Sequence, residues 1–428
     1  MRSSAAPLTL LCASVVLAAP LAAAAQPCSG SITRTSLIPC VLATSLPVQS
    51  QAEQLAAAAA QHRTARLWFP EAATLSLSAT ERFAAAVDQS QSKRYTNWYV
   101  TLEQPVEIGG ERSARLRAAD AGIAAQSRRV LVTKRDVAAN AWVTWFDLLA
   151  ADEQAHLLLR VEALLTRVAT AARATAERGL LAPIDADTAD AQALRASQAR
   201  LAAERRLAAA RAALATQLGH RPDDPTVILD GELLPLASAA SLDRVDVDQQ
   251  PEVQALLAVR ERQLAQASLF RRQRAPNLRL SVTAQNDGTD EKVVGAGVAL
   301  PLPLPEPLGR LFSGEIAEAE ALARRAAIDA EQQRRAIRQE VVVARQAYHS
   351  LKDEVARYTP SRMAQANRSL ESIVAQIAAG RLAVRDGLFA QQALLELLLA
   401  DVDARHALCL ASVELARSAG VPLEQNAQ

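Results

Sequence analysis

The chain has 428 residues, of which only 3% are aromatic, while alanine, leucine, arginine, glutamate and glutamine dominate long stretches. This composition is typical of extended helices and coiled coils, and it argues against a chain of compact globular domains. The formal net charge is +1 and no basic patch is interleaved with aromatic residues, which excludes a nucleic-acid-binding protein.

Residues 1–25 have the layout of a secretory signal peptide. Arg2 precedes the apolar run APLTLLCASVVLAAPLAAAA, and small residues suit cleavage after Ala25. Residues 26–66 are then expected to form an N-terminal segment and a first helix of an exported protein. No later stretch offers about 18 consecutive apolar residues, so a transmembrane helix is not expected.

Two of the four cysteines lie close together near the start of the mature chain. Cys28 and Cys40 are near enough in the sequence to form a disulfide in an oxidising compartment. A lipid anchor on Cys28 is the alternative. Cys409 stands alone in a segment with helical character.

Residues 67–108 are predicted to form a first β-hairpin. The segments LWFPEAATLSLSA and YTNWYVTLEQP lie on either side of a polar loop, and each has roughly the 9 to 11 residues that a tilted strand needs to cross a bilayer. Aromatic residues fall near the strand ends, where an interfacial girdle would place them. These are Trp68, Phe69, Tyr95, Trp98 and Tyr99.

Residues 109–219 are predicted to form a first helical hairpin. From Glu111 to Arg178 no proline occurs, which allows a helix of roughly 70 residues and about 100 Å. A second run follows Gly179 and is free of proline after Pro183, so this glycine is predicted at the tip of the hairpin. A heptad seam runs along the first helix: Leu157, Val161, Leu164, Val168, Ala171 and Thr175. An isolated antiparallel coiled coil is the alternative.

The second half of the chain repeats this order of elements. A linker rich in proline and aspartate (220–250) and a helix (251–275) are followed by a second β-hairpin (276–305), whose strands NLRLSVTAQ and VVGAGVALP alternate between apolar and polar residues. The apolar residues share one face, which is expected to contact lipid: Leu278, Leu280, Val282, Val294 and Val298. A soluble four-stranded sheet with one wet face is the alternative.

Residues 306–420 are predicted to form a second helical hairpin, and 421–428 a tail. Pro360 is expected to bend or break its first helix. The two tips align residue by residue, because Gly179, Leu181, Ala182 and Asp185 match Gly380, Leu382, Ala383 and Asp386. In the same register Gly219 matches Gly420, which indicates one duplicated unit.

Four strands are too few to close a barrel, because the smallest known barrels need about eight. An open edge in lipid would leave backbone groups unpaired at several kcal/mol each. If the sheet lies in a membrane, other copies of the chain must complete it.

These features resemble the outer membrane efflux proteins of Gram-negative bacteria, or TolC-type outer membrane factors, over almost all of the mature chain. The most specific stretch, RRQRAPNLRLSVTAQ with VVGAGVALPLPLP and GEIAEAEA, is similar to the heavy-metal, CzcC-like branch. The resemblance implies a mainly α fold with a membrane β-barrel. In this fold a homotrimer forms a 12-stranded barrel that a long periplasmic helical tunnel continues.

The resemblance also implies the function and the partners. The chain would be the outer membrane channel of a tripartite efflux system, a passive exit for heavy-metal cations expelled by an inner membrane RND-type pump through a periplasmic adaptor (membrane fusion protein). A duct for drug efflux or type I protein secretion is one alternative. A periplasmic coiled-coil adaptor, which usually has a single hairpin, is an alternative of another class.

Functional residues are implied at the hairpin tips. The adaptor-docking tips would be Gly179, Leu180, Leu181, Ala182, Gly380, Arg381, Leu382 and Ala383. Asp185, Arg385 and Asp386 would lie at the periplasmic constriction, where charged rings help to keep the resting tunnel shut. Because both aspartates fall at the start of a helix, a capping role is the alternative for them.

Nothing in the sequence indicates an enzyme. The five histidines lack metal-ligand spacing, and no nucleophile elbow, phosphate loop or HExxH motif occurs. They are His62, His156, His220, His349 and His406. The sequence therefore predicts no catalytic residue, no resident metal and no cofactor.

Overall fold

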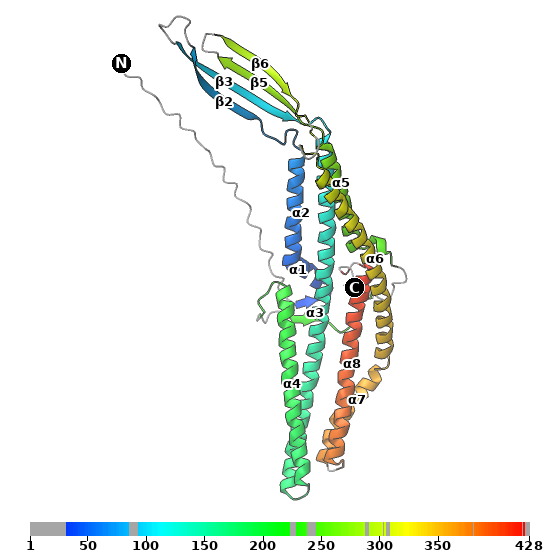
Figure 1. The fold of residues 1–428 in the computed structure, drawn as a ribbon. Coiled ribbons are helices and arrows are strands. Elements are labelled where there is room, and N and C mark those ends of the chain that lie inside the picture. Colours follow the sequence, from blue (N-terminus) through cyan, green and yellow to red (C-terminus); the bar gives the residue numbers. More distant parts are fainter. Residues whose placement is uncertain are drawn as a thin grey trace, which may run out of the picture.

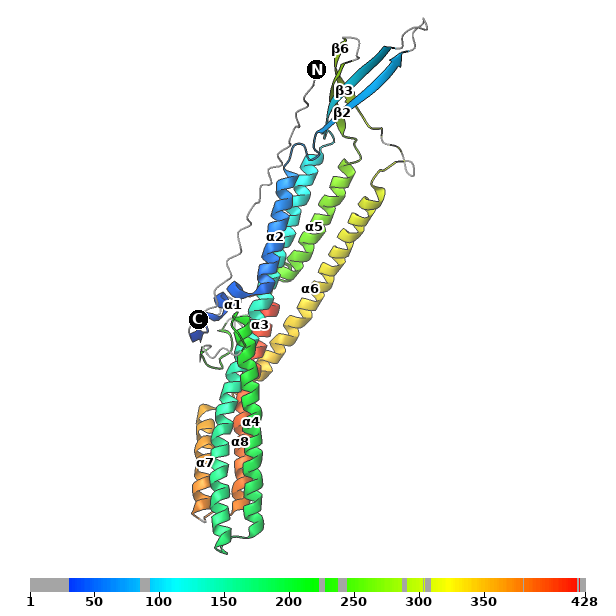
Figure 2. The ribbon, with the colours of Figure 1, turned by 90° about the vertical axis from the view of Figure 1, so that its left-hand side faces the viewer.

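The computed structural model describes residues 31–84, 93–222, 228–237, 245–286, 291–302, 304, 309–379, 381–421 and 423. The molecule is elongated, with a four-stranded sheet at one end and long helices that run away from it (Figure 1). The turn between α3 and α4 and the turn between α7 and α8 both lie at the end opposite the sheet (Figures 1 and 2). No described helix has a stretch that is long and apolar enough to span a membrane.

The first half of the chain contains a helix of unusual length. α3 (Glu111–Glu177) has 67 residues without a break, which confirms the long helix predicted from the absence of proline. The other helices of this half are α1 (Leu37–Thr44), α2 (Leu46–Ala65) and α4 (Pro183–Gln217).

The described residues of the second half form four α-helices, and proline marks where several of them begin. They are α5 (Pro251–Arg272), α6 (Ser313–Val355), α7 (Pro360–Ala378) and α8 (Val384–Ala419). Pro183, Pro251 and Pro360 each occupy the first position of a helix, where the missing backbone donor costs nothing. The predicted break at Pro360 is confirmed, because α6 ends at Val355 and α7 begins at Pro360.

Glycines in the left-handed conformation end the returning helices. Gly219 and Gly420, which the duplication aligns, have φ angles of +79° and +81°. In both copies the next backbone N–H donates to a carbonyl five residues earlier, from His220 to Ala215 at 2.9 Å and from Val421 to Ala416 at 3.1 Å. The aligned register therefore corresponds to the same local structure.

The strands of both halves form a single antiparallel sheet in the order β2-β3-β5-β6. Their bounds are β2 (Thr74–Ala84), β3 (Lys93–Val106), β5 (Leu278–Asn286) and β6 (Lys292–Ala299). β3 pairs with β5, which joins the first hairpin to the second. β2 begins later than the segment predicted from Leu67, because Pro70 cannot donate to a ladder and Leu67–Ala73 stays irregular.

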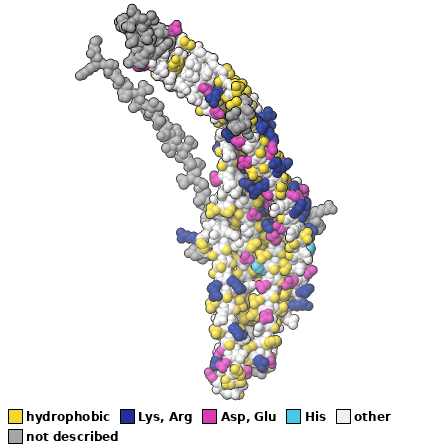
Figure 3. All heavy atoms as spheres, viewed as in Figure 1, with side chains coloured by type: hydrophobic (Ala, Val, Ile, Leu, Met, Phe, Trp, Pro, Cys, Tyr) yellow, Lys and Arg dark blue, Asp and Glu magenta, His cyan; other side chains and the backbone are white. Residues whose placement is uncertain are grey.

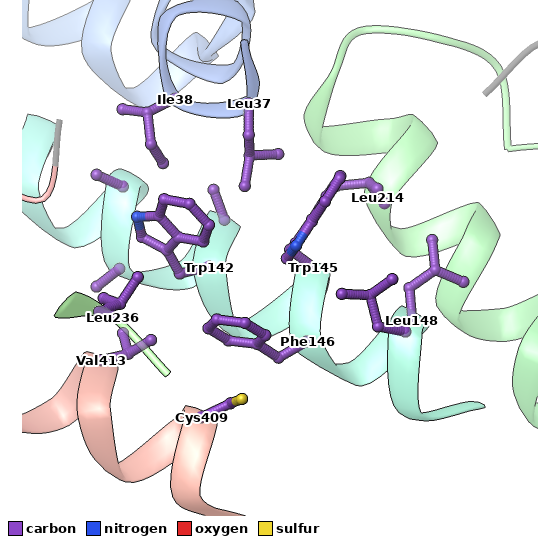
Figure 4. Close-up of a cluster of buried hydrophobic side chains, with 14 of the residues drawn as sticks. Leu37, Ile38, Trp142, Trp145, Phe146, Leu148, Leu214, Leu236, Cys409 and Val413 are labelled. Carbon is purple, nitrogen blue, oxygen red and sulfur yellow. The ribbon is translucent and has the colours of Figure 1, made fainter. Parts of the chain in front are cut away.

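A hydrophobic core packs around the middle of α3, and Figure 4 shows its buried side chains. Trp142, Trp145 and Phe146 of α3 are buried and pack with Leu37 of α1 and Leu214 of α4, among others. Ile32 of the short strand β1 (Ser31–Thr33), which pairs in parallel with β4 (Ile228–Asp230), belongs to this core. The 3-10 helix η2 (Val247–Gln249) precedes α5, and its Val247 packs against a separate small cluster of α5 and α6. The region predicted as an irregular linker thus holds short regular segments.

A second core joins the two helical hairpins between the middle of the rod and the tips. It contains side chains from α3, α4, α7 and α8. The predicted heptad seam is correct at its first four positions, which are all buried. It is wrong further along, where Ala172 is buried and Ala171 is not, because a straight helix drifts by about 20° per heptad.

Candidate functional site

One face of the sheet is apolar on all four strands. The register aligns Leu75, Leu102, Val282 and Ala296 in one row, and Leu77, Val100, Ala284 and Val294 in the next. Several of these side chains are open to solvent: Leu77 is 72% exposed, Val282 56% and Val294 78%. Figure 3 shows few charged side chains over the sheet and many over the helices, on the face in view. A continuous apolar surface of this kind marks contact with a membrane or another protein.

The opposite face of the sheet is polar. Ser76, Thr101 and Thr283 lie in one row on this face, and the hydroxyl oxygens of the two threonines are 3.4 Å apart. Arg279 forms an ion pair with Glu103 at 3.0 Å on the same face. The sheet is therefore amphipathic, with a polar surface suited to water.

The predicted lipid-facing residues share the apolar face. Leu280, Val282, Val294 and Val298 are exposed on it, and Leu278 is half-buried. Their contact with lipid stays a prediction.

The predicted aromatic girdle needs one correction. Trp98 lies on the apolar face of β3, whereas strand alternation places its neighbour Tyr99 on the polar face with Thr101. Trp68 and Phe69 are exposed in the link between α2 and β2, and the Arg112 guanidinium lies 4.0 Å from the centre of the Trp68 ring. Tyr95 belongs to β3, where it pairs with Arg82.

The sheet ends in two strands that each have one neighbour among the described strands. These are β2 and β6, which come first and last in the strand order. The free edge of each exposes backbone donors and acceptors that can pair with another strand.

The first hairpin tip is a tight, exposed turn. Gly179 has a φ of +71°, and the Leu180 N–H donates to the Thr175 carbonyl at 3.1 Å. The Leu180 side chain is 77% exposed, and Ile184 on the first turn of α4 is also exposed. Leu181 is half-buried, and Ala182 caps the N-terminus of α4.

The second tip has the same plan where the structure describes it. Gly380 lies outside the described residues, Arg381 is exposed, Leu382 is half-buried, and Ala383 caps α8. The sequence analysis missed Gly387, where an added Cβ would lie 2.5 Å from Ile377 Cδ1 and force that side chain to shift. This glycine lets α8 approach α7 closely.

The three predicted constriction residues lie in the first turns of the returning helices. Asp185 is the third residue of α4, Asp386 is the third residue of α8, and Arg385 precedes it. None of the three side chains forms an ion pair or a hydrogen bond within the described part of the chain. Both carboxylates suit the positive end of a helix dipole, and their place at the constriction stays a prediction.

Charged side chains link the two halves of the molecule above the tips. Arg405 of α8 binds Glu153 of α3 through Nη2 and Oε2 at 2.6 Å, and it also pairs with Asp401 on its own helix. Beside it, His406 Nε2 lies 2.8 Å from Asp147 Oδ1. Burial alone would lower the pKa of Arg405, but the hydrogen bonds and charges of Glu153 and Asp401 together outweigh it and raise the pKa. The sequence analysis missed this link.

The cysteines offer little reactive chemistry. Cys409 is free and buried, and burial raises the pKa of its thiol to about 12, so it stays neutral and unreactive. Cys40 is disulfide-bonded. The predicted bridge between Cys28 and Cys40 stays a prediction, because Cys28 lies outside the described residues.

Among the residues that the structure describes, no three His, Cys, Asp or Glu side chains are grouped so that they could hold a metal ion. The absence of a resident metal and of a cofactor stays a prediction.

Two solved structures share this architecture over nearly the whole chain. The outer membrane protein VceC of Vibrio cholerae superposes with a TM-score of 0.67 and 20% identity, covering 91% of this chain and 96% of VceC. The Campylobacter jejuni CmeC outer membrane channel superposes with a TM-score of 0.71 and 14% identity, covering 90% of this chain and 85% of CmeC. The chain has the outer membrane channel fold. The fold that the resemblance to the TolC-type outer membrane factors implies is thereby confirmed. Both matched proteins are outer membrane proteins, which is the location predicted for this chain.

One curated relative is a heavy-metal resistance protein. The cobalt-zinc-cadmium resistance protein CzcC of Cupriavidus metallidurans is 27% identical over 202 residues, which are 47% of this chain and 48% of that protein. The match thus spans about half of the length of the curated relative. No family model matches the chain.

Proposed function

We propose that this chain is the outer membrane channel of a tripartite efflux system. Three copies would each contribute four strands to a 12-stranded barrel, and their helices would form a periplasmic tunnel. The observation that carries the proposal is the amphipathic sheet, which has an exposed apolar face and two free edges, β2 and β6. Pairing of β6 with β2 of the next copy would satisfy both edges and turn the polar face toward a water-filled bore.

The shape of the rods supports the proposed partners. A periplasmic adaptor would dock on the two tips at the end opposite the sheet. An inner membrane RND-type pump would deliver the cargo through this adaptor. Leu180 and Ile184 support this role, because exposed apolar side chains at the end of a rod favour contact with another protein. Two hairpins in one chain speak against an adaptor, which usually has a single hairpin.

Heavy-metal cations are the proposed substrate class. The support is the similarity to CzcC, whose name refers to resistance to cobalt, zinc and cadmium. A passive duct needs no metal-binding site of its own, so the choice of cargo would belong to the pump.

Reconstitution tests the channel itself. The purified full chain in detergent should have the mass of a trimer in native mass spectrometry and should produce discrete current steps in a planar lipid bilayer. Material that is monomeric, dissolves without detergent and carries no current would overturn the proposal.

Deletion of the gene in its host tests the substrate. Sensitivity to zinc, cobalt and cadmium should increase, with no change for organic toxicants. Sensitivity to organic toxicants alone would assign the duct to drug efflux, and loss of an exported protein alone would assign it to type I secretion. No change in any of these would count against an export role.

A further inference from the structure

Arginine side chains gather where the helices meet the sheet, and Figure 3 shows basic side chains at this level on the face in view. Arg66 follows α2, Arg112 lies in the first turn of α3, Arg272 ends α5 and Arg274 comes two residues later. These four residues are called the arginine collar below. Arg112 is half-buried and the other three are exposed.

Contacts bring the helix ends of the arginine collar together. Arg112 Nη2 donates to the Arg66 carbonyl oxygen at 3.2 Å, which joins the start of α3 to the end of α2. Arg272 Nη1 lies beside Gly110, the residue that precedes α3, because a Cβ added at this glycine would be 4.0 Å away from it. The ends of α2, α3 and α5 therefore present their arginines at one level of the molecule.

The arginine collar carries positive charge that the described carboxylates do not neutralise. None of its four guanidinium groups forms an ion pair within the part of the chain that the structure describes. Neighbouring carboxylates are already paired with other arginines: Glu107 with Arg115, Glu315 with Arg310 and Glu320 with Arg271. Glu111 of α3 is buried, and burial raises the pKa of its carboxyl, which reduces its negative charge. Glu71 is exposed, so four arginines stand against few free carboxylates.

Exposed apolar side chains lie between the arginine collar and the sheet. Trp68 and Phe69 follow Arg66 on the way to β2, and Ile108 precedes Arg112 on the way from β3. The Arg112 guanidinium lies over the Trp68 ring. Aromatic rings with cationic neighbours and apolar residues on one side are typical of the boundary between a membrane and water.

The position of the arginine collar fits a layer of lipid headgroups, and this step rests on the proposed channel function. Arg274 comes four residues before Leu278, the first residue of β5, and four residues span at most about 14 Å. If the apolar face of the sheet contacts lipid, this distance places Arg274 near the headgroups that border the helices. An arginine can lay its apolar stem toward the membrane and keep its guanidinium at that level.

Charge complementarity selects the partner. A guanidinium matches the geometry of a phosphate and binds it by two parallel hydrogen bonds. A soluble phosphate has no group for the exposed apolar side chains, whereas a phospholipid supplies both a phosphate and acyl chains. Each arginine near an anionic lipid surface strengthens the attraction about fivefold.

We propose that the arginine collar binds phospholipids with a net negative headgroup, in the leaflet that borders the helices. The phosphate contacts the guanidinium groups, and the acyl chains lie along the apolar face of the sheet.

Native mass spectrometry of the full chain in detergent tests the proposal. The probes are dioleoylphosphatidylglycerol, whose headgroup is negative, and dioleoylphosphatidylcholine, which has the same acyl chains and no net charge. The first lipid should bind at least about fivefold more tightly. The preference should weaken as the salt concentration increases, because exposed charges are screened.

Variants locate the site. Arg272→Gln combined with Arg274→Gln removes two charges and should weaken phosphatidylglycerol binding about tenfold or more, with phosphatidylcholine binding unchanged. Arg66→Gln changes a side chain that forms no hydrogen bond or ion pair among the described residues, and it should weaken phosphatidylglycerol binding about fivefold. Arg205→Gln combined with Arg206→Gln, at exposed positions of α4, is the matched control and should bind as the wild type does.

The proposal is overturned if the wild type binds both lipids equally, or if the collar variants keep the full preference for phosphatidylglycerol. The same spectra report the mass of the assembly. A trimer without lipid preference would contradict the arginine collar alone, whereas a monomer that carries no current in planar bilayers would contradict the channel.

Discussion

At the scale of single residues, the burial of Gln391 in α8 predicts that its replacement changes the stability of the protein. Within the described part of the chain, the buried Gln391 amide has no hydrogen-bond partner, and an unsatisfied buried polar group costs about 1–3 kcal/mol. Gln391→Leu, which is similar in volume and apolar, should therefore raise the free energy of unfolding by about 1 kcal/mol. Chemical denaturation followed by circular dichroism measures this change.

The neighbouring glutamine supplies the control for this prediction. Gln392→Leu alters an exposed position and should change the free energy of unfolding by less than about 0.5 kcal/mol. If Gln391→Leu destabilises the protein instead, the amide has a partner that stabilises it, such as a tightly held water molecule.

A measurement of single-channel current distinguishes the constriction role of Asp386, in the first turn of α8, from its capping role. If the Asp386 carboxylates form part of a closed ring, Asp386→Ala should increase the single-channel conductance in planar lipid bilayers. Glu371→Ala, at an exposed position of α7, should leave it unchanged. An unchanged current for Asp386→Ala as well would assign the carboxylate to the helix dipole, and the thermal stability of α8 should then fall.

At the scale of elements, strand β5 offers adjacent positions on opposite faces. Val282→Lys places a charge on the apolar face, where a lysine near the middle of a bilayer costs about 2–4 kcal/mol. This variant should lose membrane assembly, as measured by the amount of trimer extracted from outer membranes.

Thr283→Lys is the matched control on the same strand. Its side chain would join the polar face, so assembly should persist and the ion selectivity should shift toward anions. If both variants assembled equally well, the apolar face would not contact lipid.

A charge introduced at the first hairpin tip should abolish export without preventing trimer assembly. Leu180→Lys puts a charge on an exposed apolar side chain at the end of the rod, and it should abolish metal resistance while trimer and conductance persist. Leu234→Lys changes an exposed leucine in the middle of the molecule and should preserve resistance. Full resistance in Leu180→Lys would remove this side chain from the docking surface.

The sequence predicted the elements well because their ends have strong local causes. Proline and left-handed glycine mark helix ends, as at Pro360 and Gly179, and alternation marks β5 and β6. The short β1 and β4 escaped prediction, since three residues carry no periodic signal. Tyr99 was assigned by its nearness to a strand end, whereas its face depends on the register of the strand.

The sites were less predictable because they depend on contacts between distant residues. The pair of Arg405 with Glu153 joins positions 252 residues apart, and a single sequence carries no signal for such a partner. The pair of Asp401 with Arg405 has a spacing of four residues on one helix, and this local signal was available. The burial of Gln391 likewise follows only from the packing of three helices around it.

At the scale of the whole molecule, Arg405 and Glu153 hold the two hairpins together above the tips. A double-mutant cycle with Arg405→Met and Glu153→Gln should give a coupling energy of about 1 kcal/mol in unfolding, because the pair is partly shielded from solvent. The pair of Arg417 with Glu414, within α8 and more exposed at its carboxylate, should give about 0.3–0.5 kcal/mol. Additive effects of Arg405→Met and Glu153→Gln would show that the link contributes no stability.

The number of residues in the unbroken helix α3 sets the distance that this helix spans. At about 1.5 Å per residue, its 67 residues measure about 100 Å from the sheet toward the first tip. Each inserted residue would lengthen α3 by about 1.5 Å and rotate the part of the helix beyond it by about 100°. The buried side chains of that part would then turn away from the helices they pack against. Only insertions of about 7, 11 or 18 residues bring the buried stripe back into line, so lengths that differ by whole turns are the ones such a rod can adopt.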